Sequence, residues 1–181
     1  ADVTDASLTV AGYSLETDLR RDRQDTGHGV GGGLLVYSRT GTSILPLADY
    51  DSKFNQHCRF SIGTKRNSLN IILTYRPTGS TRENDMKLCE ILRVADSNTL
   101  IIGDINMPGI DWESGKSDAR GRALMETVEE ENMEQMVRFS THTKGNILDL
   151  VITNCPERVV GITDEGRLGK SDHCILMIEI E

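Results

Sequence analysis

Aromatic residues are scarce in this chain, making up 4% of its 181 residues, whereas hydrophobic residues as a whole make up 37%. The core must therefore consist of aliphatic Leu, Ile and Val side chains rather than rings. That composition is ordinary for a soluble α/β protein. A chain of this length buries roughly two-thirds or more of the surface that its unfolded form exposes. We therefore predict one domain over 1–181 with a real hydrophobic core.

Long apolar runs and closely spaced cysteines are also missing. No segment approaches the roughly 20 apolar residues of a membrane-spanning helix, and the N-terminus lacks the basic start and apolar run of a secretory signal. We therefore expect an intracellular protein, cytoplasmic or nuclear, with no membrane partner. The cysteines contain no C-x-x-C pair, which indicates buried free thiols rather than a zinc site or a redox dithiol. They are Cys58, Cys89, Cys155 and Cys174.

Positive charge is in short supply, because 20 Lys and Arg residues face 28 Asp and Glu residues, for a net charge of −8. This balance argues against nucleic-acid binding by electrostatics alone, since counterion release needs clustered cations. The densest basic cluster, 19–23, alternates with acids and favours a solvated loop over a phosphate contact. An acidic balance does suit a site that gathers divalent cations.

Short aliphatic and β-branched runs predict most of the strands. The glycine-rich run 27–33 leads into one at 34–38, and a strand at this point argues against a nucleotide-binding loop, which needs a helix. Further strands are predicted over 58–62, 69–75, 99–102, 135–139, 148–153, 159–163 and 175–180.

Two helices are predicted between these strands. A capping box at 80–83, with Met86, Cys89 and Leu92 in helical spacing behind it, indicates the first. The second runs from about 118 to 130, where the apolar stripe consists of Ala123, Leu124 and Val128. Many strands with few helices favour an α/β sandwich of mostly antiparallel sheets over a doubly wound parallel sheet.

Polar residues at strand ends provide the candidate chemistry. Asp104 and Asn106 follow an apolar strand, in a pattern that fits a turn as well as an active site. Asp172 and His173 precede another strand and combine a metal carboxylate with an acid or base. Asp149 interrupts a third apolar strand, where a carboxylate is costly unless it is paired.

These segments imply a cleft across strand ends. Asp149 is placed to accept a hydrogen bond from His173 and to fix its tautomer, as a carboxylate does for a catalytic imidazole. Tyr75 and Arg76 end a fourth strand with a phenol and a guanidinium, both of which suit phosphate oxygens.

The order of these motifs resembles the endonuclease/exonuclease/phosphatase superfamily, and most of all the endonuclease domain of non-LTR retrotransposons. The matching segments are 75–77, 103–106, 148–150 and 171–173, with further counterparts in the glycine-rich entry to Leu34, the approach 141–146 and the pair Asp111-Trp112. The resemblance implies a four-layered α/β sandwich of two mostly antiparallel sheets flanked by helices. It also implies a nuclease that uses Mg²⁺ or Mn²⁺ to hydrolyse DNA.

The resemblance further implies a role for each residue. Asp104 would orient or deprotonate the attacking water and share in metal binding, while Asn106 and Tyr75 hold the scissile phosphate. His173, oriented by Asp149, would stabilise charge on the phosphorus centre or act as the base. The remaining roles fall to Asp172 in the metal shell and to Arg76, Asn146 and His142 in substrate binding.

Two departures from the family pattern leave alternatives open. The family's leading strand, helix and strand, which bear an Asn and a metal-binding Glu, have no counterpart in 1–18, and Thr78 replaces an Asn. One alternative is therefore a retroelement-derived nucleic-acid-binding or regulatory protein that has lost catalysis with that Glu. Another is an unrelated structural domain. Because strands without their neighbours expose open edges, we also expect a homodimer.

Overall fold

The computed structural model describes residues 4–22, 33–50, 54, 56–64 and 67–181. The glycine-rich run 27–33 lies outside these residues apart from Gly33. In the described part, no helix is long and apolar enough to cross a membrane. Three cysteines are buried free thiols as predicted, whereas Cys174 is partly exposed.

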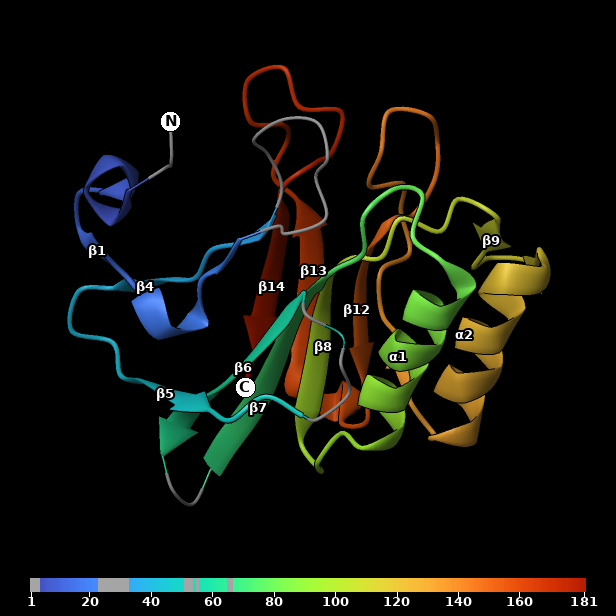
Figure 1. The fold of residues 1–181 in the computed structure, drawn as a ribbon, viewed down its shortest axis with the longest axis horizontal. Helices are drawn as coiled ribbons and strands as arrows, with labels where there is room; N and C mark the ends of the chain where they lie inside the picture. Colours follow the sequence, from blue (N-terminus) through green and yellow to red (C-terminus); the bar gives the residue numbers. More distant parts are fainter. Residues whose placement is uncertain (1–3, 23–32, 51–53, 55, 65–66) are drawn as a thin grey trace.

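A six-stranded sheet forms the centre of the molecule (Figure 1). Its order is β11-β12-β8-β7-β6-β5, and every neighbouring pair is antiparallel except β7 and β8. A parallel pair needs a crossover, and the helix α1 supplies it. The strands are β5 Ile44–Leu47, β6 His57–Thr64, β7 Asn67–Tyr75, β8 Thr99–Asp104, β11 Glu134–Gln135 and β12 Asp149–Thr153.

Smaller elements surround this sheet. Among the described residues, pairs of strands form four two-stranded sheets. These are β1 Tyr13–Leu15 with β4 Tyr37–Arg39, β2 Arg21–Asp22 with β3 Gly33–Leu34, β9 Ile110–Asp111 with β10 Lys116–Ser117, and β13 Val159–Asp164 with β14 Leu176–Ile180. Three short 3-10 turns are η1 Asp5–Leu8, η2 Thr17–Leu19 and η3 Pro156–Arg158.

Both faces of the central sheet are covered. The helices α1 (Arg82–Arg93) and α2 (Ala119–Glu130) lie side by side on one face and bury Leu88, Leu92 and Leu124 against it. On the other face β13 and β14 pack with the N-terminal segment, which contributes Leu19 and other residues. This mixed architecture of mostly antiparallel strands with few helices confirms the predicted α/β class.

The helix starts and stripes differ from prediction in detail. The cap of α1 is Thr81, whose hydroxyl accepts from the Asn84 amide at 3.2 Å, so the predicted box was placed one residue early. Met86 is 57% exposed, and Ala123 is exposed as well. The buried stripes instead contain Asp85 in α1 and Gly121 and Thr127 in α2.

Two predicted strands are shorter than expected. The run 34–38 is divided between β3 and β4, which pair with different strands, β2 and β1. The run 135–139 pairs only at its start. Gln135 bonds through its side-chain amide to the backbone of Val137, at 2.8 Å and 2.6 Å, and so replaces the ladder there.

Gly103 allows β7 and β8 to approach closely just before Asp104. Its φ is +155°, and a Cβ at this position would lie 1.7 Å from the backbone oxygen of Thr74. We expect Gly103→Ala to lower the free energy of unfolding by about 3 kcal/mol through forced strand separation, as measured by urea denaturation. Gly161→Ala is the control, because nothing lies within 4 Å of its Cβ position. Equal losses for both variants would contradict the explanation.

Candidate active site

Strand register brings three predicted site residues to one end of the central sheet. Asp104 at the end of β8 pairs with Asp149 on one side and with Tyr75 on the other. Directly paired residues project from the same face of a sheet. That face is the one on which Tyr75 packs with residues of β13 and β14. Three strands that are distant in sequence therefore place their polar ends together.

His173 joins this group from the loop that precedes β14. Its Nδ1 lies 2.7 Å from Oδ2 of Asp149, which is the predicted hydrogen bond. When Nδ1–H donates to the carboxylate, Nε2 is left to act towards a substrate. Asp149 therefore fixes both the tautomer and the direction of the imidazole.

Asp104 is the acid of this group whose pKa is raised. Burial, followed by the charge of Asp149, raises its pKa to about 6, although His173 and the backbone N–H of Asn106 act in the opposite direction. Its Oδ1 is buried and accepts no hydrogen bond from the described residues. An unpaired carboxylate oxygen in such a place is costly unless a ligand or proton satisfies it.

His173 is affected by the same carboxylates. Burial is the largest single influence and lowers its pKa, but the hydrogen bond and charge of Asp149, together with Asp104 and Asp172, outweigh it. The pKa of His173 is therefore raised above its ordinary value. The imidazole consequently keeps its second proton to a higher pH than a free histidine does.

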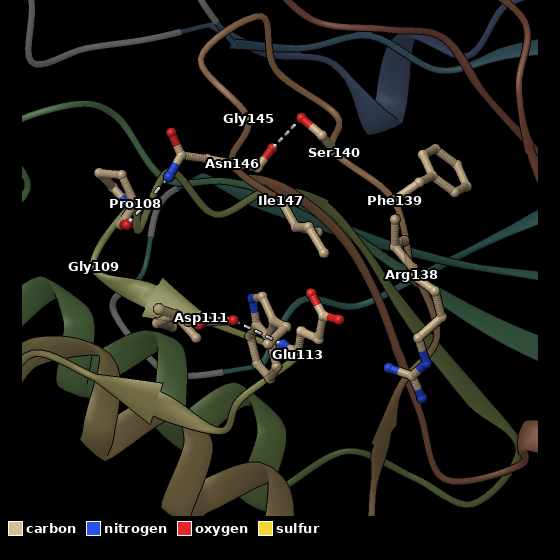
Figure 2. A pocket seen from close by; sticks show the side chains of 13 residues that line it. Pro108, Gly109, Asp111, Glu113, Arg138, Phe139, Ser140, Gly145, Asn146 and Ile147 are labelled. Carbon is tan, nitrogen blue, oxygen red and sulfur yellow. Dashed lines mark hydrogen bonds between the residues drawn. The ribbon is translucent and has the colours of Figure 1, made fainter.

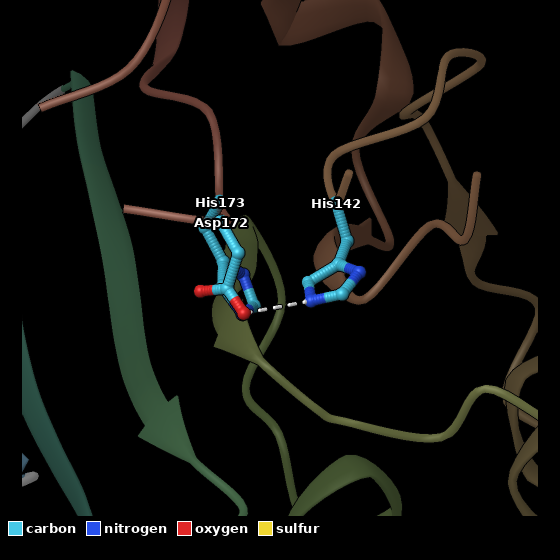
Figure 3. Close-up of side chains that lie close together, drawn as sticks. All are labelled: His142, Asp172 and His173. Carbon is cyan, nitrogen blue, oxygen red and sulfur yellow. Dashed lines mark hydrogen bonds and ion pairs between the residues drawn. The ribbon is translucent and has the colours of Figure 1, made fainter. Parts of the chain in front are cut away.

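Asp172 and His142 lie close to His173 (Figure 3). The Nε2 of His142 is 3.1 Å from Oδ2 of Asp172, and the two histidine rings meet edge to face with centroids 5.0 Å apart. Asp172 is otherwise exposed, with 67% of its side chain accessible. Its pKa is lowered, first by its own backbone N–H and then by His142.

Arg76, the predicted phosphate contact, takes part in a buried network. Its guanidinium is buried, with Nε 2.6 Å from Oδ1 of Asp85 and Nη1 2.8 Å from the backbone oxygen of Asn106. Asp85 also accepts from Nε of Arg120 at 2.9 Å. The network ties both helices to the loop after β8, where Asn106 has a φ of +47°. The structure thus gives Arg76 a positioning role.

A cleft of about 580 Å³ lies beside the site (Figure 2). Asn146 lines it and donates from Nδ2 to the Pro108 oxygen at 3.3 Å. The other lining side chains combine aromatic, apolar and charged groups; among them are Trp112, Phe139, Ile147, Glu113 and Arg138. None of the residues at the centre of the site lines this cleft, although 106–109 connects the two. Of its lining residues, Asn146 was predicted to bind substrate and the pair Asp111-Trp112 belonged to the family resemblance.

Residues 69–177 match the family described as endonuclease-reverse transcriptase, and this range contains every site residue described above. The chain belongs to this endonuclease-reverse transcriptase family. Its fold resembles the endonuclease domain of TRAS1, a telomere-specific non-LTR retrotransposon, with a TM-score of 0.69 and 15% identity over 94% of this chain and 79% of that one. At that identity the likeness concerns the fold. A search of curated proteins finds no match.

The acidic donors of this endonuclease-family site fit a divalent cation. Asp104, Asp149 and His173 each offer one ligand atom, and these atoms lie within 4.8 Å of one another. The Oδ1 of Asp104 is buried and accepts no hydrogen bond from the described residues, so a cation there would satisfy it. Hard cations such as Mg²⁺ and Mn²⁺ prefer carboxylate oxygens. Asp172 supplies a further exposed carboxylate next to His173.

The raised pKa of Asp104 has a consequence for stability. A proton that binds more tightly in the folded state stabilises the fold below pH 4, and this contribution is lost as the pH rises through about 6. We expect Asp104→Asn, in EDTA, to stabilise the protein by on the order of 1 kcal/mol at pH 7.5 and to have little effect at pH 4.

Thermal unfolding at the two pH values measures this difference. Asp111→Asn is the control of opposite sign, because hydrogen bonds from Ser114 lower the pKa of Asp111, so removing its charge costs stability at neutral pH. Destabilisation by Asp104→Asn at pH 7.5 would show that the charged carboxylate of Asp104 does not destabilise the folded state.

Proposed function

We propose that this protein is a nuclease that acts inside the cell and hydrolyses phosphodiester bonds of DNA, with Mg²⁺ or Mn²⁺ as its cofactor. The observation that carries the proposal is the group formed by Asp104, Asp149 and His173 at one end of the sheet, in a chain of an endonuclease family. The similar TRAS1 domain is an endonuclease of a telomere-specific element, which supports DNA as the substrate class.

Asp104 is the group that accepts a proton from the attacking water. Its Oδ1 has no competing donor among the described residues, and its pKa of about 6 is close to neutrality, where a general base is most effective. The oxygen of the water forms the new bond to phosphorus and its proton passes to Asp104. The deoxyribose oxygen leaves as the old bond to phosphorus breaks.

His173 stabilises the charge that develops on the phosphate oxygens. Because its pKa is raised, the imidazole keeps a proton on Nε2 to a higher pH than a free histidine does, while Asp149 holds Nδ1–H. Asn106 and Tyr75 hold the scissile phosphate, and Asn146 contacts the substrate from the neighbouring cleft. Arg76 holds Asn106 in place by donating a hydrogen bond from Nη1 to the backbone oxygen of Asn106.

A divalent cation held by Asp172 and Asp104 would neutralise phosphate charge and polarise the phosphorus when bound. Asp104 and Asp172 each belong to a group of possible ligands that includes His173 and whose ligand atoms lie within 4.8 Å of one another, which supports this assignment.

Plasmid nicking tests the proposal. We expect cleavage with Mg²⁺ or Mn²⁺ that EDTA abolishes. Asp104→Ala and His173→Ala should each lower the rate at least about a hundredfold, the scale of a lost general acid or base, with folding retained by circular dichroism. Lys87→Gln, on α1 and outside the site, is the control and should keep full activity. DNA binding without cleavage by any divalent ion would favour the alternative of a binding protein.

A homodimer is the second part of the proposal. In the described chain β13 and β14 pair only with each other, and the outer side of their sheet exposes Val160, Ile175 and Met177, at 58%, 43% and 56%. Open strand edges with apolar side chains favour addition of a second chain.

Light scattering at micromolar concentration measures the assembly. We expect a dimer that Met177→Lys converts to monomer because the charge would be buried at the interface. Leu45→Lys on β5, which is 62% exposed, should leave the dimer intact. A compact wild-type monomer would refute the assembly.

A further inference from the structure

Both ring nitrogens of His142 have hydrogen-bond partners. The side chain is buried, at 9% exposure, and its Nδ1 lies 3.1 Å from the backbone nitrogen of Lys144. A backbone N–H can only donate, so Nδ1 must be the acceptor. The ring hydrogen therefore sits on Nε2, which donates to Oδ2 of Asp172 at 3.1 Å.

Asp172 depends on this contact for its orientation. Within the described part of the chain, no other residue's side chain bonds to its carboxylate, and most of that side chain is exposed. The other bond to this carboxylate comes from the backbone N–H of Asp172 itself, so without His142 no other residue selects among the rotamers of an exposed side chain. The Nε2–H of His142 thus selects the rotamer in which Asp172 lies beside His173 (Figure 3).

The backbone around His142 links the two loops of the site. His142 and His173 form an isolated antiparallel bridge. The backbone N–H of Thr143 donates to the backbone oxygen of Asp172 at 2.9 Å. The Cys174 amide donates to the Thr141 oxygen, also at 2.9 Å. Backbone hydrogen bonds therefore join the loop that carries His142 to the loop that carries Asp172.

We propose that His142 is a positioning residue that holds the Asp172 carboxylate in place for the cation and does not itself ligate a metal. The inference rests on the proposed function, because it takes Asp172 as a metal ligand. His142, Asp172 and His173 offer ligand atoms within 4.8 Å of one another, as a direct metal site would. Ligation through Nε2 would require its hydrogen to move to Nδ1, where the Lys144 N–H already points.

Substitutions at His142 separate positioning from ligation. Gln places an amide N–H near the position of Nε2 and keeps the donor, whereas Glu has the same shape but offers only acceptors. If His142 positions Asp172, the Gln variant keeps cation binding and the Glu variant loses it. If His142 is a ligand, Glu substitutes for it and Gln does not, because hard cations prefer carboxylates.

The measurement is Mn²⁺ binding to the full chain without DNA, followed by electron paramagnetic resonance of the free ion. We expect His142→Ala to weaken binding about 10- to 100-fold, the usual effect of losing a partner that orients a ligand. His142→Gln should stay within a few-fold of wild type, and His142→Glu should bind as weakly as Asp172→Asn. Thermal unfolding identifies any variant that fails to fold, and the Ala and Gln variants then decide the test.

The outcomes separate this inference from the proposed function. Wild-type protein that binds no Mn²⁺ would overturn the metal mechanism and the role of His142 together. Unchanged binding by a folded His142→Ala variant would overturn the role of His142 and leave the metal mechanism standing. Binding retained by Glu and lost by Gln would make His142 a ligand.

Discussion

The pairing of Asp104 with Asp149 across neighbouring strands is the constraint on which the site depends. Burial penalises the charged form of Asp104, and repulsion from Asp149 at the opposed position adds to the cost, which is why the pKa of Asp104 is raised to about 6. The hydrogen bond from His173 relieves Asp149, whereas Asp104 keeps an oxygen without a partner among the described residues. The fold thus holds one acid in a state that a proton or a cation would stabilise.

The remaining elements hold that pair in register. Gly103 lets β8 approach β7 closely enough for Tyr75 to lie opposite Asp104. The Arg76 and Asp85 pair then fixes the loop after β8 from the helix side, since its hydrogen bond reaches the Asn106 backbone. Burying such an ion pair contributes little to stability, because desolvation offsets the attraction. Its effect is on geometry at the end of the sheet.

Sequence alone predicted the parts of the fold whose signal is local. The strands β7, β8 and β12 stand out because long aliphatic runs end in polar residues, so Asp104 and Asp149 could be placed at strand ends. The partnership of Asp149 with His173 followed from the cost of a lone carboxylate. Asp85 gave no such signal, because its partners Arg76 and Arg120 meet it only through tertiary packing. The tautomer of His142 likewise depends on a loop hydrogen bond.

Net charge is a poor guide to partners here because charge is distributed unevenly along the chain. Acidic residues concentrate towards the end of α2, which carries Glu126, Glu129 and Glu130. The two loops that hold the site carry exposed Lys144 and Lys170 beside the Asp172 carboxylate they flank, and both loops lie at the same end of the molecule (Figure 1). Charges are screened beyond about 8 Å at physiological ionic strength. A polyanion that approaches these loops therefore responds to the charges nearby rather than to the total of −8.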